Sequence, residues 1–180
     1  MKCICILPIG DIDGNLLLGI SGIIQNVFGR RTKILVGIEK PESAYDQTRG
    51  QYLSTAILKS TLENADDSTE KIIGVTETDI FVPVLKFVFG QAQFSGTAAL
   101  VSLCRLSQKF YDLPENRNLL ALRLKKEVVH ELGHAYGLVH CGSPQCVMHY
   151  ANSLKEVDAR PLEFCDTCFK LLRNNLAAEE

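Results

Sequence analysis

The sequence has no apolar stretch long enough to cross a membrane and no recognisable export signal. A membrane-spanning helix needs about 18 or more consecutive apolar residues, and nothing here approaches that length. The opening MKCICILPIG combines a lysine with an apolar run, but no small-residue cleavage site follows; Asp11 and Asp13 come instead. We therefore expect a cytoplasmic protein with no membrane partner, in which residues 3–9 form a buried strand.

The sequence also lacks a strong excess of charge of either sign. Its formal net charge is −2, which offers no basic surface to a nucleic acid, so we expect no nucleic-acid partner. The basic run RLKK at residues 123–126 is interpreted as a solvent-exposed helix face. No repeat, low-complexity tract or long linker divides the 180 residues, and we expect one domain over residues 1–180 and a monomer.

Seven cysteines are an odd number, which fits poorly with a disulfide framework in a chain without a secretory signal. In a reducing cytosol, clustered cysteines more often bind metal. Cys3, Cys5 and Cys104 stand in apolar runs and are interpreted as small core residues. The other four fall within the last 40 residues and form a candidate metal site.

Up to about residue 105, strand patterns and helix patterns alternate along the chain. The β-α-β-α-β order predicts an α/β (α+β) fold with a largely parallel sheet and helices packed on it. Gly90, in the middle of an expected strand, indicates a bulge or the close approach of another backbone. The expected strands are residues 3–9, 32–38, 71–81, 85–94 and 98–106, and the expected helices in this part are residues 14–29 and 46–65.

Two more helices are expected in the second half. The first covers residues 115–137, with Pro114 suited to the first helical position and Gly137 to the sharp turn after the last one. The second covers residues 161–178.

The strongest functional signal is HELGHAYGLVH, which begins at His130. His130 and His134 are four residues apart, so both rings lie on one helix face and can reach one zinc ion. Glu131 lies beside that ion, where it can hold the water bound to the metal, and His140 reaches the same ion after the turn at Gly137. Three neutral imidazoles and a water make the open site of a catalytic zinc; incidental histidines and a closed structural zinc are the alternatives.

The motif HExxHxxGxxH followed by Met148 resembles the metzincin metalloproteases, and CxxxxCxM with a later CxxC resembles the archaemetzincins in particular. The resemblance implies a metzincin-like fold: a twisted mixed sheet with an antiparallel edge strand, backing helices and an active-site helix. It also implies an N-terminal subdomain of residues 1–137 and a small, zinc-stabilised C-terminal subdomain of residues 138–180. Met148 matches the methionine that packs beneath the three histidines.

These parts favour a zinc-dependent metallopeptidase. Zinc lowers the pKa of its bound water toward about 7, and Glu131 takes the proton as general base and returns it to the leaving amine. Zinc also stabilises the oxyanion of the tetrahedral intermediate. The alternatives are a catalytically silent, zinc-stabilised peptide-binding domain and a hydrolase of non-peptide amides. Glu131 favours the enzyme, because a scaffold has no need of a carboxylate beside the metal.

A second zinc is expected on four cysteines. Four thiolates in a tetrahedral array suit a structural zinc, with one or two disulfides or an iron centre as alternatives. The neighbours His140 and Cys141 would then serve two different ions, one catalytic and one structural. The four ligands are Cys141, Cys146, Cys165 and Cys168.

The substrate is expected to be a peptide or protein. The family binds substrate along an antiparallel edge strand, and residues 86–94 are the candidate, with Phe89, Gly90 and Gln91 in contact with substrate; a strand that merely packs its phenylalanines is the alternative. Tyr150 either donates a hydrogen bond near the metal or packs as a half-buried tyrosine. His149 is interpreted as an exposed loop residue.

Overall fold

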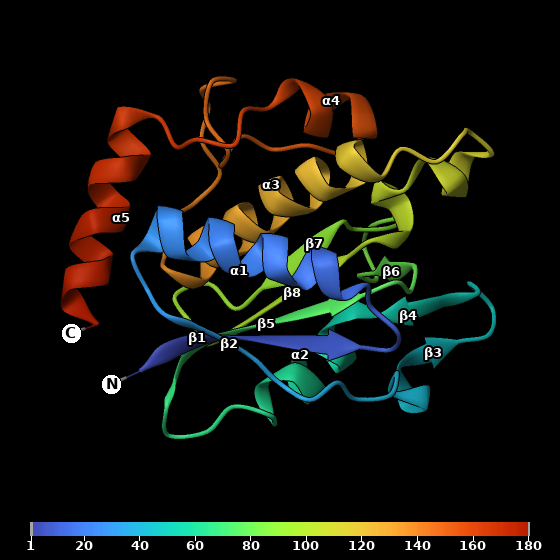
Figure 1. Cartoon of the computed structure of the whole chain (residues 1–180). Coiled ribbons are helices and arrows are strands. Elements are labelled where there is room, and N and C mark those ends of the chain that lie inside the picture. Colours follow the sequence, from blue (N-terminus) through green and yellow to red (C-terminus); the bar gives the residue numbers. More distant parts are fainter. Residues whose placement is uncertain (1, 180) are drawn as a thin grey trace.

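A five-stranded mixed sheet forms the centre of the structure, a computed structural model that describes residues 2–179 (Figure 1). The strand order is β2-β1-β5-β8-β7. The first four strands are parallel, and β7 pairs antiparallel with β8 at the edge. This confirms the mixed sheet with an antiparallel edge strand. Its strands are β1 (Cys3–Ile9), β2 (Thr32–Ile34), β5 (Thr69–Thr76), β7 (Gly90–Ala92) and β8 (Ala98–Ser102).

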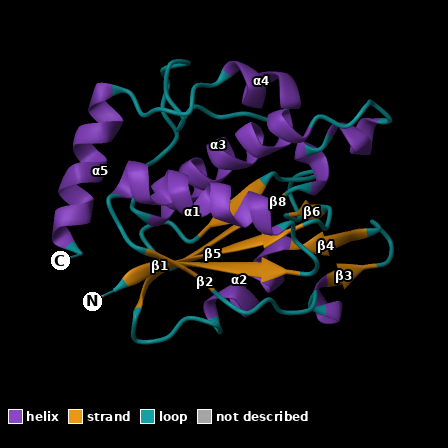
Figure 2. Cartoon of the chain, in the orientation of Figure 1, coloured by secondary structure: helices purple, strands orange, loops and turns teal. Residues whose placement is uncertain are grey.

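Helices cover both faces of this sheet (Figures 1 and 2). On one face lie α1 (Gly14–Phe28) and α3 (Arg117–Ala135), and α2 (Ser54–Leu62) lies on the other. Every residue of β1, β5 and β8 is buried. Parallel strands covered on both faces need such runs, because neither face meets water.

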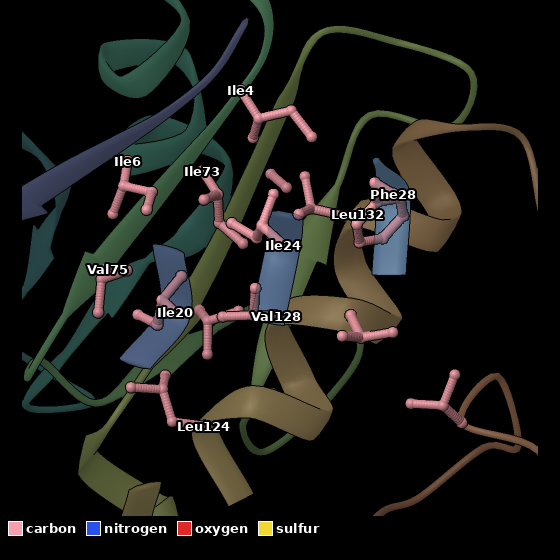
Figure 3. Close-up of a cluster of buried hydrophobic side chains, with 14 of the residues drawn as sticks. Ile4, Ile6, Ile20, Ile24, Phe28, Ile73, Val75, Leu124, Val128 and Leu132 are labelled. Carbon is pink, nitrogen blue, oxygen red and sulfur yellow. The ribbon is translucent and has the colours of Figure 1, made fainter. Parts of the chain in front are cut away.

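The larger core lies between the sheet and the pair α1 and α3. Ile20 and Ile24 of α1 meet Val128 and Leu132 of α3 over Ile73 of β5 (Figure 3). The apolar residues of α1 recur at spacings of three and four, which places them on one buried face. The helix that carries His130 and His134 is therefore held against the sheet from Leu124 onward.

The predicted helix over residues 46–65 is wrong in its first half. A short second sheet occupies that region, and α2 begins only at Ser54. Asp46 accepts hydrogen bonds from the backbone amides of Thr48 and Arg49, and this local turn replaces a helical one. The second sheet consists of β3 (Tyr45–Asp46), β4 (Gln51–Leu53) and β6 (Ile80–Phe81).

Several other elements are shorter than predicted. The strand expected over residues 71–81 divides into β5 and β6, which belong to different sheets. Of the strand expected over residues 85–94, only residues 90–92 have strand structure, as β7. β2 ends at Ile34 and β8 ends at Ser102, both earlier than predicted. The structure also has three 3-10 turns, Glu42–Ala44, Cys104–Leu106 and Gln108–Tyr111.

The helix ends are set by caps. Asn116 accepts a hydrogen bond from the amide of Leu119, so α3 starts at Arg117, and Pro114 lies before the helix rather than at its first position. Gly137 has φ +84°, the left-handed conformation predicted for it.

Two helices form the C-terminal part, one of them not predicted from the sequence. This is α4 (Leu154–Ala159), where the Ser153 side chain accepts from the Glu156 amide and caps the first turn. The predicted C-terminal helix starts later than expected, as α5 (Asp166–Ala178). No helix in the described part of the chain is long and apolar enough to span a bilayer.

The basic run at residues 123–126 is not a solvent-exposed face. Arg123 and Lys126 are buried and bind α4. Arg123 forms a two-pronged ion pair with Asp158, and the Lys126 ammonium donates to the carbonyls of Val157 and Asp158. The long apolar stems are covered because α4 packs over them, which the sequence pattern did not show.

Candidate active site and metal centres

A cleft of about 500 Å³ lies between α3 and the edge strand β7. The side chains of His130, Glu131 and His134 enter it from α3, and His140 and Tyr150 enter from the loops that follow. The remaining wall includes the loop before β7, at residues 85–89. The cleft is thus built where the most buried helix faces the open edge of the sheet.

Backbone carbonyls fix the orientation of the two helical histidines. His130 Nδ1 lies 2.8 Å from the carbonyl of Val147, and His134 Nδ1 lies 2.7 Å from the carbonyl of Leu138. A carbonyl can only accept, so each Nδ1 carries the proton and each Nε2 presents a lone pair. The two Nε2 atoms face one another at 3.1 Å.

Two lone pairs at that distance repel unless a cation lies between them. In a tetrahedral zinc site with Zn–N bonds of about 2.05 Å, ligand nitrogens are about 3.3 Å apart. His140 completes the set, since ligand atoms of all three histidines lie within 4.8 Å of one another. The donor set therefore fits one zinc ion.

The surroundings keep these imidazoles neutral. Burial lowers the pKa of His130 well below its usual range, and the charge of Arg160 lowers it further. Burial is also the largest cause that lowers the pKa of His134 and of His140. Neutral imidazole is the form that binds a metal, so the site is prepared for one.

Glu131 is almost completely buried, at 6% exposed. Burial raises its pKa well above the usual range, Glu127 raises it further, and Arg160 lowers it. Its carboxylate lies directly against β7: a Cβ on Gly90 would sit 2.6 Å from Glu131 Oε1. The glycine inside the predicted strand therefore marks the close approach of the Glu131 side chain and not a bulge.

The four clustered cysteines lie close together as well. Their sulfur atoms all lie within 4.8 Å of one another, and those of Cys141 and Cys165 are 3.8 Å apart. A disulfide needs about 2.05 Å, whereas a tetrahedral site with Zn–S bonds of about 2.3 Å places its sulfurs about 3.8 Å apart. The geometry fits a zinc ion and not a disulfide.

Backbone amides support thiolates in this cluster. The amide of Ser143 donates to Cys141 Sγ, and the amide of Cys165 donates to Cys146 Sγ. Hydrogen bonds, first that from the Cys168 amide, lower the pKa of Cys165 to about 7. Burial raises the pKa of Cys146 and Cys168, which a bound cation would offset.

The two candidate centres share a loop. The amide of Cys141 donates to the carbonyl of Met148, and His149 Nδ1 lies 2.9 Å from the carbonyl of Cys141. His149 is therefore half-buried and bonded, rather than an exposed loop residue. Met148 is fully buried beneath α3, against Gly133. His140 and Cys141 therefore lie on one short backbone segment that two hydrogen bonds hold in place.

The side chains expected to contact substrate differ in whether they face the three histidines. Gln91 points away from the histidines, where its Oε1 lies 2.6 Å from Ser54 Oγ. Phe89 is buried and packs edge-on against Phe87. Tyr150 is 48% exposed, and its ring lies 5.2 Å from the His140 ring.

Sequence reasoning missed a buried ion pair in the cleft, Arg160 with Glu127. Glu127 lies one helical turn before Glu131, a spacing that could have drawn attention to it. Arg160 gave no such signal, because its partner is 33 residues away and the intervening helix was not predicted.

Known proteins share the fold and a large part of the sequence. An open mixed sheet above a helix that presents paired imidazoles to a cleft defines a metallopeptidase of the metzincin type. The model of peptidase family M54 matches residues 15–174. The chain belongs to this family, the archaemetzincins, and is a zinc metallopeptidase.

Three relatives show how far the similarity extends. Archaemetzincin of Methanocaldococcus jannaschii is 43% identical over 171 residues, 95% of this chain and 93% of that protein. The crystal structure of archaemetzincin from Methanopyrus kandleri has a TM-score of 0.85 at 34% identity and covers 98% of this chain and 96% of its own. That of a zinc-dependent peptidase from Methanocorpusculum labreanum has a TM-score of 0.83 at 28% identity, covering 94% and 99%. These matches confirm the family and fold suggested by the motif.

Proposed function

We propose that this metallopeptidase hydrolyses peptide bonds in the cleft between α3 and β7, with zinc held by His130, His134 and His140 and with Glu131 as general base. The observation that carries the proposal is the pair of Nε2 lone pairs that face one another at 3.1 Å beside a buried carboxylate. Zinc bound there would supply a Lewis acid for the scissile carbonyl and for a water molecule.

Glu131 would perform the proton transfers. Its carboxylate lies in the cleft but is not needed as a ligand, because three imidazoles already supply the donor set. A carboxylate in low-dielectric surroundings is a stronger base than one in water, which suits it to take a proton from water and return it to the leaving amine.

The edge strand β7 would bind the substrate backbone. The amide of Ser102 donates to the Phe89 carbonyl, and the amide of Gln93 donates to the Ala98 carbonyl, so residues 89 and 93 turn their backbone groups toward β8. In an antiparallel ladder this direction alternates. Gly90 and Ala92 therefore turn their amides and carbonyls to the open edge, where a peptide can pair with them.

This register refines the roles expected from the sequence. Gly90 would contact substrate through its backbone. Phe89 and Gln91 support β7 from inside rather than touching substrate with their side chains. Tyr150, half-exposed beside His140, is the side chain best placed to donate a hydrogen bond to the substrate carbonyl or its oxyanion.

The second zinc would be structural, held by Cys141, Cys146, Cys165 and Cys168. It would connect the loop that carries His140 to α5, the helix that starts beside Cys165. A segment such as residues 138–180 buries little core by itself, and a metal coupled to its folding stabilises it. We propose that this segment forms a C-terminal subdomain packed on an N-terminal subdomain of residues 1–137.

The substitution Glu131→Gln tests the mechanism. It preserves the size of the side chain and removes the base, so zinc content and melting temperature should stay close to those of the parent. Hydrolysis should fall by about 10²–10⁴-fold, the usual contribution of a general base. The assay is digestion of a peptide library read by mass spectrometry, with metal content measured on the same samples.

Glu63→Gln is the matched control, since Glu63 is exposed at the end of α2 on the opposite face of the sheet. It should leave cleavage unchanged. A Glu131→Gln protein that keeps most of its activity would refute the role of Glu131. A fully zinc-loaded parent that cleaves no peptide would refute the proposed activity itself.

A further inference from the structure

Arg160 is a buried cation in a place that the metal-ligand motif does not explain. It follows α4 directly and is only 3% exposed. One end of its guanidinium forms an ion pair with Glu127, whose side chain is 4% exposed. The pair therefore joins the end of α4 to the active-site helix α3 within the protein interior.

The other end of the guanidinium reaches the candidate metal site. Arg160 Nη1 donates to the carbonyl of His149 at 2.9 Å and lies 3.0 Å from His130 Nδ1. The same His130 nitrogen donates to the carbonyl of Val147, so its contact with Arg160 Nη1 is a packing contact and not a hydrogen bond. One planar group thus contacts α3, a ligand ring and the backbone that follows Met148.

Other contacts also attach α4 to α3. Lys126 already binds the carbonyls of Val157 and Asp158, and Arg123 binds the Asp158 carboxylate. A buried ion pair adds little stability over apolar packing of the same size. Arg160 Nε is buried without a hydrogen-bond partner among the described residues. The position of the guanidinium therefore does not satisfy all of its N–H donors.

We infer that Arg160 is a positioning residue for the proposed peptidase site: paired with Glu127 of α3, it holds the His149 carbonyl and packs against the edge of the His130 ring. The inference rests on the proposed function. A planar guanidinium suits this task, because its fork holds two acceptors in fixed directions, which an ammonium does not. Loss of the fork would release the His149 carbonyl and remove the group that packs against the His130 ring beside Val147.

The test compares Arg160→Met with Arg123→Met. Methionine fills similar space without charge, and Arg123 belongs to the same α3–α4 contact but touches no candidate ligand. Both variants should melt at lower temperature than the parent. Arg160→Met alone should lose about 10–100-fold in kcat and in zinc affinity of the histidine site, as is usual when the groups that orient metal ligands are removed. KM should change by less than about twofold.

Cobalt substitution and a conservative variant separate position from stability. The visible spectrum of the cobalt-loaded protein should change in Arg160→Met and not in Arg123→Met. Arg160→Lys keeps a cation opposite Glu127, so it should recover more of the melting temperature than of kcat. Glu127→Gln, which keeps an acceptor, should show a weaker form of the Arg160→Met defect and serves if that variant does not fold.

Three results would overturn the inference. One is parental kcat, zinc affinity and cobalt spectrum in Arg160→Met. Another is an equal loss of kcat in Arg123→Met, which would assign the effect to helix docking. The third is full recovery of kcat in Arg160→Lys. If the parent cleaves no peptide, zinc affinity and the cobalt spectrum still decide whether Arg160 positions the ligands.

Discussion

Replacing Gly90 by alanine should disable the site with a single methyl group. The added Cβ would sit 2.6 Å from Glu131 Oε1, 2.7 Å from Glu131 Cγ and 2.7 Å from the Leu100 carbonyl oxygen, whereas ordinary contact begins at 3.4 Å. Relief therefore needs movements of about 0.8 Å in the carboxylate or in the β7–β8 pairing. The Leu100 carbonyl is part of β8 and moves least, so Glu131 should be displaced.

The size of the effect follows from this displacement. Overpacking of a buried site costs about 1–3 kcal/mol, which lowers the melting temperature by about 2–12 °C in a chain of this length. A misplacement of about 1 Å costs about 100-fold in rate. We expect Gly90→Ala to bind zinc like the parent and to cleave an identified peptide about 100-fold more slowly, measured as kcat with thermal melting on the same sample.

Gly22→Ala is the matched control, because nothing lies within 4 Å of a Cβ there, on α1. It should leave cleavage unchanged and raise stability by about 0.5–1 kcal/mol, the gain from alanine inside a helix. A Gly90→Ala protein with parental kcat and melting temperature would refute the close approach of Glu131 to β7.

Three further predictions concern the metals and a thiol. Cys165→Ser should weaken zinc binding at the histidine site by about 10–100-fold, because the loop that carries His140 loses its anchor although no histidine is removed. Cys104→Ser should leave both metals bound. Equal metal content in the two variants would refute the coupling between the cysteine site and the histidine site. The purified protein should contain two zinc ions, and mild chelation should remove one together with activity while the fold persists; loss of both at once would contradict two separate sites. Burial raises the pKa of the Cys104 thiol to about 11, so alkylation of this residue should be slow at pH 8 and accelerate as the pH approaches 11; rapid labelling at pH 8 would contradict its burial.

The local parts of the site could be predicted from the sequence, since their geometry depends on short spacings. His130 and His134 lie on one helix face whatever the helix packs against. The left-handed turn at Gly137 is likewise a local property of glycine. The class of protein and its mixed sheet followed from the same short motif.

The missed features depend on contacts between distant segments. In the sequence, Arg123 and Lys126 resemble solvent-exposed charges, because the α4 helix that covers them is not predicted. The burial of Arg160 likewise depends on its ion pair with the distant Glu127. The helical spacing of apolar side chains begins only at Tyr52, and the prediction extended it back over residues 46–51, which have none. The Asp46 turn and the left-handed Gly50 direct residues 46–53 into a hairpin. Periodicity alone does not decide between a short helix and a short strand pair.

The shortness of β7 limits how well the open edge of the sheet can pair with the extended chains of other proteins. An unpaired strand edge recruits any extended chain, including a second copy of itself, and long open edges lead to aggregation. Three residues span only about 10 Å and offer the outward groups of Gly90 and Ala92 alone. Backbone pairing of that length is too weak to retain a peptide by itself, so a chain that does not also engage the metal or a side pocket leaves again. A strand this short is therefore a poor template for pairing with a second copy, and substrate selectivity would depend on side chains.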